Sequence, residues 1–207
     1  GRMITTVSTF RQLIGLALTG PSGLVCLLAT LTIPLLKRMR HDFTVHNRIR
    51  SSTAALMWVD YLAYARLFAD AMITPSPRLP RSLPRRAVGA SMIASGAIAS
   101  LLAVQQFAGL PQITGTNPGH LITRGIYRYS RNPQYVGLVV ALTGLALLRP
   151  SARAFLLAAI LAAVYGTWVP CEETYLERRF GARYVRYRRA TPRWFGVPYR
   201  NTDTRRD

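Results

Sequence analysis

Long apolar stretches separated by short polar ones run along most of the chain. Four are clear, at residues 13–36, 87–109, 135–148 and 152–170. A helix that crosses the hydrocarbon core of a bilayer needs about 20 residues, so only 135–148 is short for a complete span. Three residues separate the last two stretches, which predicts an antiparallel helical hairpin. The pattern as a whole predicts an all-α, polytopic membrane protein.

A fifth stretch, residues 53–74, is long enough to span but contains Asp60, Arg66 and Asp70. Charge inside a bilayer is costly unless it is paired or faces a polar cavity. Arg66 and Asp70 are four residues apart and share a helical face. We therefore expect a buried ion pair that orients this helix, or else a polar face that contacts a substrate.

The distribution of basic residues favours five spans. With 53–74 counted as a span, the loops on one side hold 18 lysines and arginines and those on the other side hold 8; without it the numbers become 15 and 12. Because positive residues concentrate in cytoplasmic loops, we expect the C-terminus in the cytoplasm, and the protein in a bacterial inner membrane. We divide the chain into two N-terminal spans and a connector at 1–86, and a core of three spans, a loop and a tail at 87–207.

The charge of the chain narrows its class further. Half of the 207 residues are apolar, yet the formal net charge is +19. A nucleic-acid-binding protein could carry this charge but would not need the long apolar stretches, so we expect no nucleic-acid partner. Cys26 and Cys171 form no metal-binding spacing with histidine, and we expect free thiols and no metal.

The C-terminal tail has an apolar stripe among its arginines. Leu176, Phe180, Tyr184 and Tyr187 recur at helical spacing, which is typical of an amphipathic helix that lies on anionic lipid. This interpretation does not explain Glu172 and Glu173. They are two of only eight carboxylates, and they stand where the last span is expected to leave the membrane.

A polar and aromatic segment precedes the stretch 135–148. It contains Tyr127, an Asn132-Pro133 pair and Tyr135. Pro133 suits the first turn of a helix, and the amino end of a helix can hold a carboxylate. Together with the glutamates, which can bind an ammonium group, the segment predicts a site for a zwitterionic, amino-acid-like ligand with an aromatic part. The alternative is that these side chains only anchor the chain at the membrane interface.

Residues 112 to about 194 resemble the isoprenylcysteine carboxyl methyltransferase and phospholipid methyltransferase superfamily of integral membrane enzymes. The matching sequences are HLITRGIYRYSRNPQYVG and EETYLERRFGARYVRYRRATPRW. They are similar to the family's G-x-Y-x-x-x-R-H-P-x-Y-x-G and E-E-x-x-L-x-x-x-F-G-x-x-Y-x-x-Y patterns. Their order, the hairpin between them and the membrane setting agree, whereas the first two spans carry no signature.

The resemblance implies S-adenosyl-L-methionine as methyl donor, S-adenosyl-L-homocysteine as its product, and a lipid or other lipophilic acceptor. Arg131 and Glu173 are the expected catalytic residues, and Trp168 is expected to contact the substrate. The residues implied to bind the cofactor are Gln112, Gly119, His120, Leu121, Ile122, Gly125, Tyr127, Asn132, Pro133, Gln134, Tyr135 and Glu172.

Two positions depart from the family pattern. Asn132 stands where the family most often has histidine, and an amide cannot act as a general base. Trp168 stands where prenylcysteine enzymes carry an arginine that is taken to hold the substrate carboxylate. Arg131 could replace that arginine. The departures leave the acceptor open, because a carboxylate needs no base whereas an amine or alcohol does.

Two other functions remain as alternatives. A membrane reductase of the sterol-reductase type resembles the same region but uses NADPH. A non-catalytic membrane scaffold could retain a vestigial cofactor pocket.

Overall fold

The computed structural model describes residues 21–73, 82–117 and 119–199, except for the side chains of 21, 22 and 24–27. The start of the first expected span, most of the proline-rich connector, the side chain of Cys26 and the end of the tail lie outside this part. Regular structure within it is entirely helical. The elements are α2 (Pro21–His41), η1 (Asp42–His46), α3 (Ser51–Ile73), α4 (Leu83–Val104), α5 (Leu110–Ile113), η2 (Gly125–Arg128), α6 (Pro133–Leu148), α7 (Ala152–Phe180) and α8 (Ala182–Ala190).

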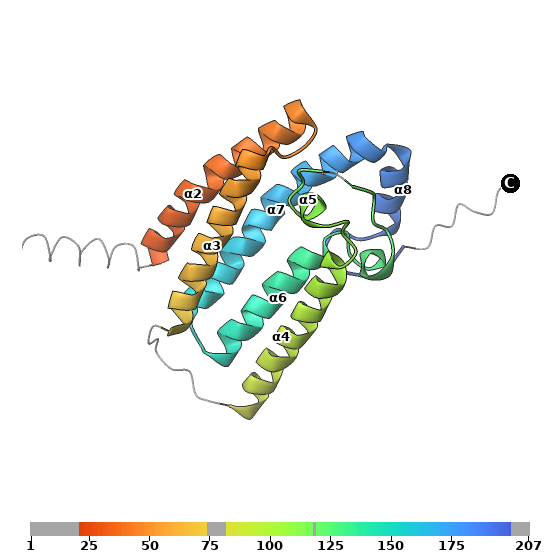
Figure 1. Cartoon of the computed structure of the whole chain (residues 1–207). Helices are drawn as coiled ribbons and strands as arrows, with labels where there is room; N and C mark the ends of the chain where they lie inside the picture. Colours follow the sequence, from red (N-terminus) through yellow and green to blue (C-terminus); the bar gives the residue numbers. More distant parts are fainter. Residues whose placement is uncertain (1–20, 74–81, 118, 200–207) are drawn as a thin grey trace, which may run out of the picture.

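The long helices form a bundle with α7 at its centre. Helices α2 and α3 pack together against α7, and α4 and α6 form a second pair (Figure 1). The short elements α5 and α8 lie at one end of the bundle. The C-terminal end of α2 and the N-terminal end of α6 lie at the same end of the bundle. Residues that are far apart in the sequence therefore converge there.

The predicted hairpin is confirmed. Helix α6 ends at Leu148 and α7 begins at Ala152. The hydroxyl of Ser151 accepts a hydrogen bond from the backbone N–H of Ala154 at 3.3 Å and donates one to the carbonyl of Ala71 at 2.8 Å. A capping side chain of this kind satisfies a free amide at a helix start, and here it also attaches the turn to α3.

Two of the described helices, α4 and α7, are long and apolar enough to cross a membrane, and α6 is a shorter apolar helix. Helix α3 has 23 residues, but it contains the charged positions noted above and is not one of the two. The all-helical class is therefore confirmed, while the number of five spans stays a prediction.

The prediction of a buried ion pair on α3 is wrong. Arg66 and Asp70 are both exposed, and no ion pair joins them in the part of the chain that the structure describes. The buried face of α3 is instead formed by Tyr64, Phe68 and Ala71. A helix has 3.6 residues per turn, so positions 66 and 70 point away from this face.

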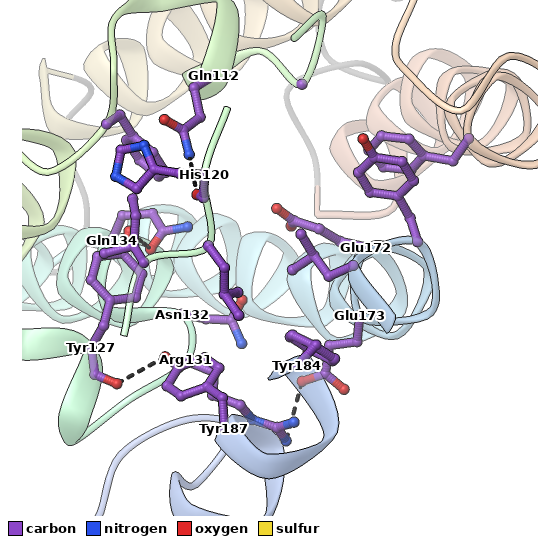
Figure 2. Close-up of a pocket in the computed structure, with 17 residues that line it drawn as sticks. Gln112, His120, Tyr127, Arg131, Asn132, Gln134, Glu172, Glu173, Tyr184 and Tyr187 are labelled. Atoms are coloured by element: carbon purple, nitrogen blue, oxygen red, sulfur yellow. Dashed lines mark hydrogen bonds and ion pairs between the residues drawn. The ribbon is translucent and has the colours of Figure 1, made fainter. Parts of the chain in front are cut away.

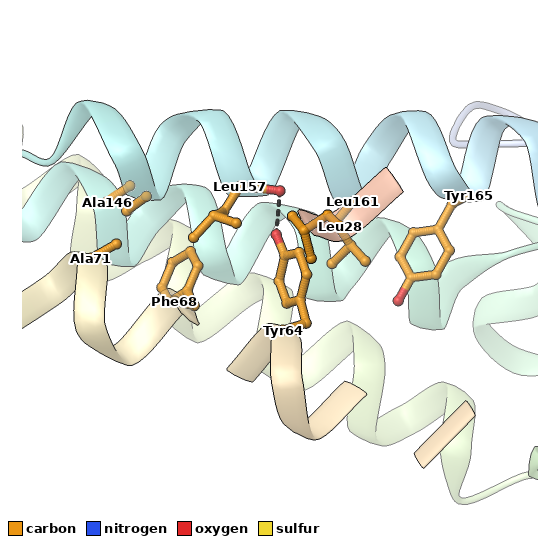
Figure 3. Close-up of a cluster of buried hydrophobic side chains, with 9 residues drawn as sticks. Leu28, Tyr64, Phe68, Ala71, Ala146, Leu157, Leu161 and Tyr165 are labelled. Atoms are coloured by element: carbon orange, nitrogen blue, oxygen red, sulfur yellow. Dashed lines mark hydrogen bonds between the residues drawn. The ribbon is translucent and has the colours of Figure 1, made fainter. Parts of the chain in front are cut away.

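The core between α2, α3 and α7 is apolar apart from two buried tyrosines, Tyr64 and Tyr165 (Figure 3). Leu28, Phe68, Leu157 and Leu161 pack together there. The hydroxyl of Tyr64 lies among them and donates a hydrogen bond to the carbonyl of Leu157. Because a buried hydroxyl needs a partner, this bond allows a tyrosine at that position in the core.

A buried carboxylate fixes the segment between α2 and α3. Asp42 is fully buried and accepts hydrogen bonds from the Thr53 hydroxyl at 2.6 Å, from the Arg50 backbone at 3.0 Å and from the Arg50 Nε at 2.8 Å. Burial by itself raises the pKa of Asp42, but these hydrogen bonds outweigh it and bring the pKa below the ordinary value of 3.8. The π-helical turn η1, which carries Phe43, is held in this way.

We expect Asp42→Asn to lower the free energy of unfolding by about 1–3 kcal/mol, because an amide cannot accept from all three donors. Since the pKa is lowered in the folded state, the stabilisation is present above about pH 4 and is lost as the pH falls through the folded pKa. Thermal unfolding in detergent at several pH values measures both effects. Asp70→Asn, on the exposed face of α3, is the matched control, and an equal loss in both variants would contradict the prediction.

Candidate functional site

A partly open cavity lies at the end of the bundle that carries α5 and α8 (Figure 2). Its walls come from η1, from α5 and η2 with the loops beside them, and from α6, α7 and α8. The lining residues are Phe43, Phe107, Gln112, Gly115, His120, Leu121, Ile122, Tyr127, Arg131, Asn132, Gln134, Glu172, Glu173, Tyr175, Leu176, Tyr184 and Tyr187.

Ten of the fifteen predicted site residues line this cavity, and five do not. Those that line it are Gln112, His120, Leu121, Ile122, Tyr127, Arg131, Asn132, Gln134, Glu172 and Glu173. Those that do not are Gly119, Gly125, Pro133, Tyr135 and Trp168. The two parts of the sequence pattern are thus brought together in one place, although more than 35 residues separate them.

Tyr135 and Trp168 lie behind the cavity wall and orient Glu172. The Tyr135 hydroxyl donates a hydrogen bond to Glu172 Oε2 at 3.2 Å and accepts one from Trp168 Nε1 at 3.3 Å. Trp168 is buried and stacks on Phe43 with ring centroids 5.2 Å apart. In this structure, therefore, Trp168 supports a tyrosine that holds the carboxylate.

Glu172 follows the apolar stretch that ends at Pro170, so it lies outside the segment that we assign to the membrane. Burial is the main cause that raises the pKa of its carboxyl; the Tyr135 hydrogen bond lowers this pKa, the nearby Glu173 raises it, and the net value is about 7. Within the described residues, no arginine or lysine forms an ion pair with Glu172. A half-buried carboxylate without a paired cation is suited to bind a positively charged group of a ligand.

Glu173, the next residue, is in a different environment. Its carboxylate contacts Arg131 Nη2 at 3.1 Å and Arg193 Nη2 at 2.7 Å. The two glutamates therefore do not act as an equivalent pair, and only Glu172 is available to a ligand's ammonium group.

The loop after α5 is shaped by Gln112. Its side chain accepts a hydrogen bond from the Ala108 backbone at 2.8 Å and donates one to the His120 carbonyl at 2.8 Å. Gly119 has φ +58°, and a Cβ at this position would lie 2.5 Å from the Gln112 side chain. A positive φ of this kind favours glycine, so Gly119 helps the chain to turn into His120, which lines the cavity.

Tyr127 and Tyr187 join η2 to α8. The Tyr127 hydroxyl donates to Gln134 Oε1 at 3.3 Å, and the Tyr187 hydroxyl donates to the Tyr127 carbonyl at 2.8 Å. Burial raises the pKa of both phenols well above their ordinary value, so both stay protonated and can donate. Gly125, with φ +57°, begins η2, and Pro133 occupies the first turn of α6 as predicted.

The tail is not the single helix that the apolar stripe predicts. Gly181, with φ +52°, separates α7 from α8, and this change of direction turns Tyr184 and Tyr187 into the cavity. Leu176 lines it as well. Three of the four residues of the stripe thus belong to the site, whereas Phe180 does not line the cavity. The position of the tail on anionic lipid stays a prediction.

The sequence did not suggest four of the residues that line the cavity, namely Phe43, Phe107, Gly115 and Tyr175. The rings of Phe43 and Tyr175 stack with centroids 4.4 Å apart. Phe43 comes from the N-terminal half, where no motif is recognisable, so its place depends on the packing of η1 against α7. Within the described residues, no cluster of three histidine, cysteine, aspartate or glutamate side chains could hold a metal, and Cys171 is a free thiol.

Comparison with known proteins agrees with this geometry. Residues 84–183 match the model of the phospholipid methyltransferase family. Protein-S-isoprenylcysteine O-methyltransferase B of Arabidopsis thaliana is 34% identical over 120 residues, which cover 55% of this chain and 59% of that protein. The match thus extends over about three fifths of the relative's length. No solved structure matches the chain.

Proposed function

Since this chain belongs to the superfamily of isoprenylcysteine carboxyl and phospholipid methyltransferases, we propose that it methylates a lipophilic acceptor with S-adenosylmethionine as donor. The bound donor would supply a methyl group on a positively charged sulfonium centre. The observation that carries the proposal is the convergence of residues 120–134 and Glu172 on one cavity.

The charges of the cavity fit such a ligand. Glu172 is a half-buried carboxylate without a paired cation among the described residues, and Arg131 has side-chain nitrogens without hydrogen bonds. A ligand that carries both an ammonium group and a carboxylate would pair with Glu172 through the first and with Arg131 through the second. The residues that would hold it are Gln112, His120, Leu121, Ile122, Tyr127, Asn132, Gln134 and Glu172.

The protein would act mainly by positioning. Holding a nucleophile in line with an electrophilic carbon removes much of the entropic cost of the reaction. Asn132 donates its side-chain N–H to the Arg193 carbonyl at 3.0 Å, so its amide is used to fix the loop. Asn132 itself therefore supplies no proton acceptor, and a methyl acceptor that is already anionic would need none.

The acceptor would reach the cavity from the membrane. The described helices α4 and α7 can span a bilayer, and the cavity lies at one end of the bundle. By the distribution of positive charge this end would face the cytoplasm, where the donor is available. We propose five spans for the whole arrangement, with α3 as one of them.

Binding of S-adenosylhomocysteine to the detergent-purified protein tests the proposal, with NADPH as the comparison. We expect saturable calorimetric binding of the former alone. Label from methyl-labelled donor should then appear in the lipid extract of membranes that contain the protein. Binding of NADPH alone would favour a reductase, and cofactor binding without transfer to any lipid fraction would favour the scaffold.

A further inference from the structure

Two arginines share a single carboxylate at the wall of the cavity. Arg193 Nε contacts both oxygens of Glu173, at 3.2 and 3.1 Å, and its Nη2 contacts Oε2 at 2.7 Å. Arg131 reaches the same carboxylate with Nη2 only, at 3.1 Å. Arg193 thus makes the fork-shaped contact that arginine favours with carboxylates, and one positive charge in the trio has no counterpart.

The remaining nitrogens of Arg131 have no partner. Its side chain is only 9% exposed, and Nε and Nη1 are buried without a hydrogen bond. The hydroxyl of Tyr184, a residue that is 1% exposed, is likewise buried without a hydrogen bond, and it lies beside the Arg131 side chain. Both side chains line the cavity (Figure 2). Buried polar groups are rarely left unsatisfied, and those that are call for an explanation.

We propose that Arg131 and Tyr184 form a subsite for an anionic group, a carboxylate or a phosphate, of a ligand in the cavity. The inference rests on the proposed function and deepens it, because it assigns the residues that would hold the anionic group of the ligand. An anion here would satisfy the excess positive charge, and hydrogen bonds from charged donors to an anion are the strongest kind. The group would come either from the amino-acid end of the donor or from the acceptor.

Arg193 is the positioning residue of this subsite. It belongs to the segment after α8, which is attached to the Arg131 loop by a backbone hydrogen bond from Arg131 N to Pro192 O at 3.0 Å. By occupying Glu173 with three contacts, Arg193 prevents that carboxylate from also engaging Arg131 Nε. Without Arg193, Glu173 would turn to Arg131 and neutralise the nitrogens that face the cavity.

Analogues of the donor product provide the first arm of the test. S-adenosylhomocysteine carries the carboxylate, and its decarboxylated analogue keeps the ammonium group but lacks the acid. If the donor supplies the anion, we expect Arg131→Gln to weaken binding of S-adenosylhomocysteine about 10- to 100-fold and to leave the analogue within about twofold. Arg128→Gln, an exposed arginine of η2, is the matched control and should change neither.

A second arm of the test asks whether the methyl acceptor supplies the anionic group. If Arg131→Gln leaves S-adenosylhomocysteine unchanged but abolishes a preference of the protein for octanoate or octyl phosphate over octanol, the anion belongs to the acceptor. Either result supports the subsite. Unchanged affinities in both arms would overturn it. A wild-type protein that ignores S-adenosylhomocysteine would refute the proposed function separately, because the octanoate and octyl phosphate comparison does not depend on it.

Arg193→Gln keeps the test usable if Arg131→Gln does not fold. The positioning role predicts a loss of about 3- to 10-fold that is confined to the anionic ligand, with partial recovery in Arg193→Lys. A role in folding alone would weaken the anionic ligand and the neutral or decarboxylated one equally, and that result would overturn the assignment of Arg193.

Discussion

Glu172→Gln is expected to weaken binding of S-adenosylhomocysteine about 100-fold and to lower methyl transfer with it. The substitution keeps the size of the side chain and its hydrogen bond with Tyr135, but removes the only cavity carboxylate that no arginine occupies. A ligand ammonium group in a buried site would lose its counter-charge, which costs more than the same loss at the surface. Calorimetry with the purified variant measures the effect.

Glu177→Gln is the matched control for this experiment. Glu177 lies on the same helix, but its ion pair with Arg188 is about 40% exposed and lies outside the cavity. Exposed pairs contribute little to stability or binding, so the affinity of this variant should equal that of the wild type. If Glu172→Gln also bound with wild-type affinity, the assignment of Glu172 to the ligand would be wrong.

The same carboxylate predicts a pH dependence. Because burial raises the pKa of Glu172 to about 7, its carboxyl is mostly protonated near pH 6 and mostly ionised near pH 8. A cationic group binds the ionised form, so the affinity of the wild type should rise over this interval, and binding near pH 6.5 should release protons. The glutamine variant should show neither effect, and a flat wild-type profile would contradict the role of Glu172.

The contrast between Glu172 and Glu173 marks a limit of prediction from sequence. The two are identical in type and adjacent, and the sequence suggests the same role for both. Successive residues on a helix point about 100° apart, so one faces Tyr135 and the other faces two arginines. Arg193 comes from 20 residues further on, and nothing local predicts that contact.

Local features were predicted well because they depend on residues that are close in the sequence. Pro133 at the start of α6 and the turn at Ser151 depend on a few neighbouring residues, and both are confirmed. The aromatic stripe of the tail was also recognised, but its direction depends on the break at Gly181. Phe43 could not be predicted at all, because its place follows from a π-helical turn and a buried aspartate.

Gly137→Leu is expected to destabilise the protein by at least about 3 kcal/mol and to abolish ligand binding. A Cβ at position 137 would lie 2.5 Å from the Gly96 carbonyl and 2.8 Å from the Ser100 backbone nitrogen. Both contacts are with backbone atoms of α4, so no side-chain rotation can relieve them. Small residues allow such close helix packing in membranes, and a larger one must push α4 and α6 apart.

The site depends on this packing because α6 begins at the cavity. Ser100 donates a hydrogen bond to the Gln134 carbonyl at 3.1 Å, so a shift of α6 against α4 moves Gln134 and the residues before it. Gly96→Ala is the milder test, because it adds only a methyl group, which would press on the Gly137 carbonyl. We expect this variant to fold with reduced stability and weaker binding of S-adenosylhomocysteine.

Gly166→Leu separates this effect from a general intolerance of larger residues in the helices. Gly166 lies on the exposed side of α7, and a Cβ there would meet no atom within 4 Å. Its thermal unfolding in detergent should equal that of the wild type or exceed it slightly, because leucine is the better helix former. If Gly137→Leu unfolded at the same temperature as Gly166→Leu, the close approach of α4 and α6 would not be what holds the helix bundle together.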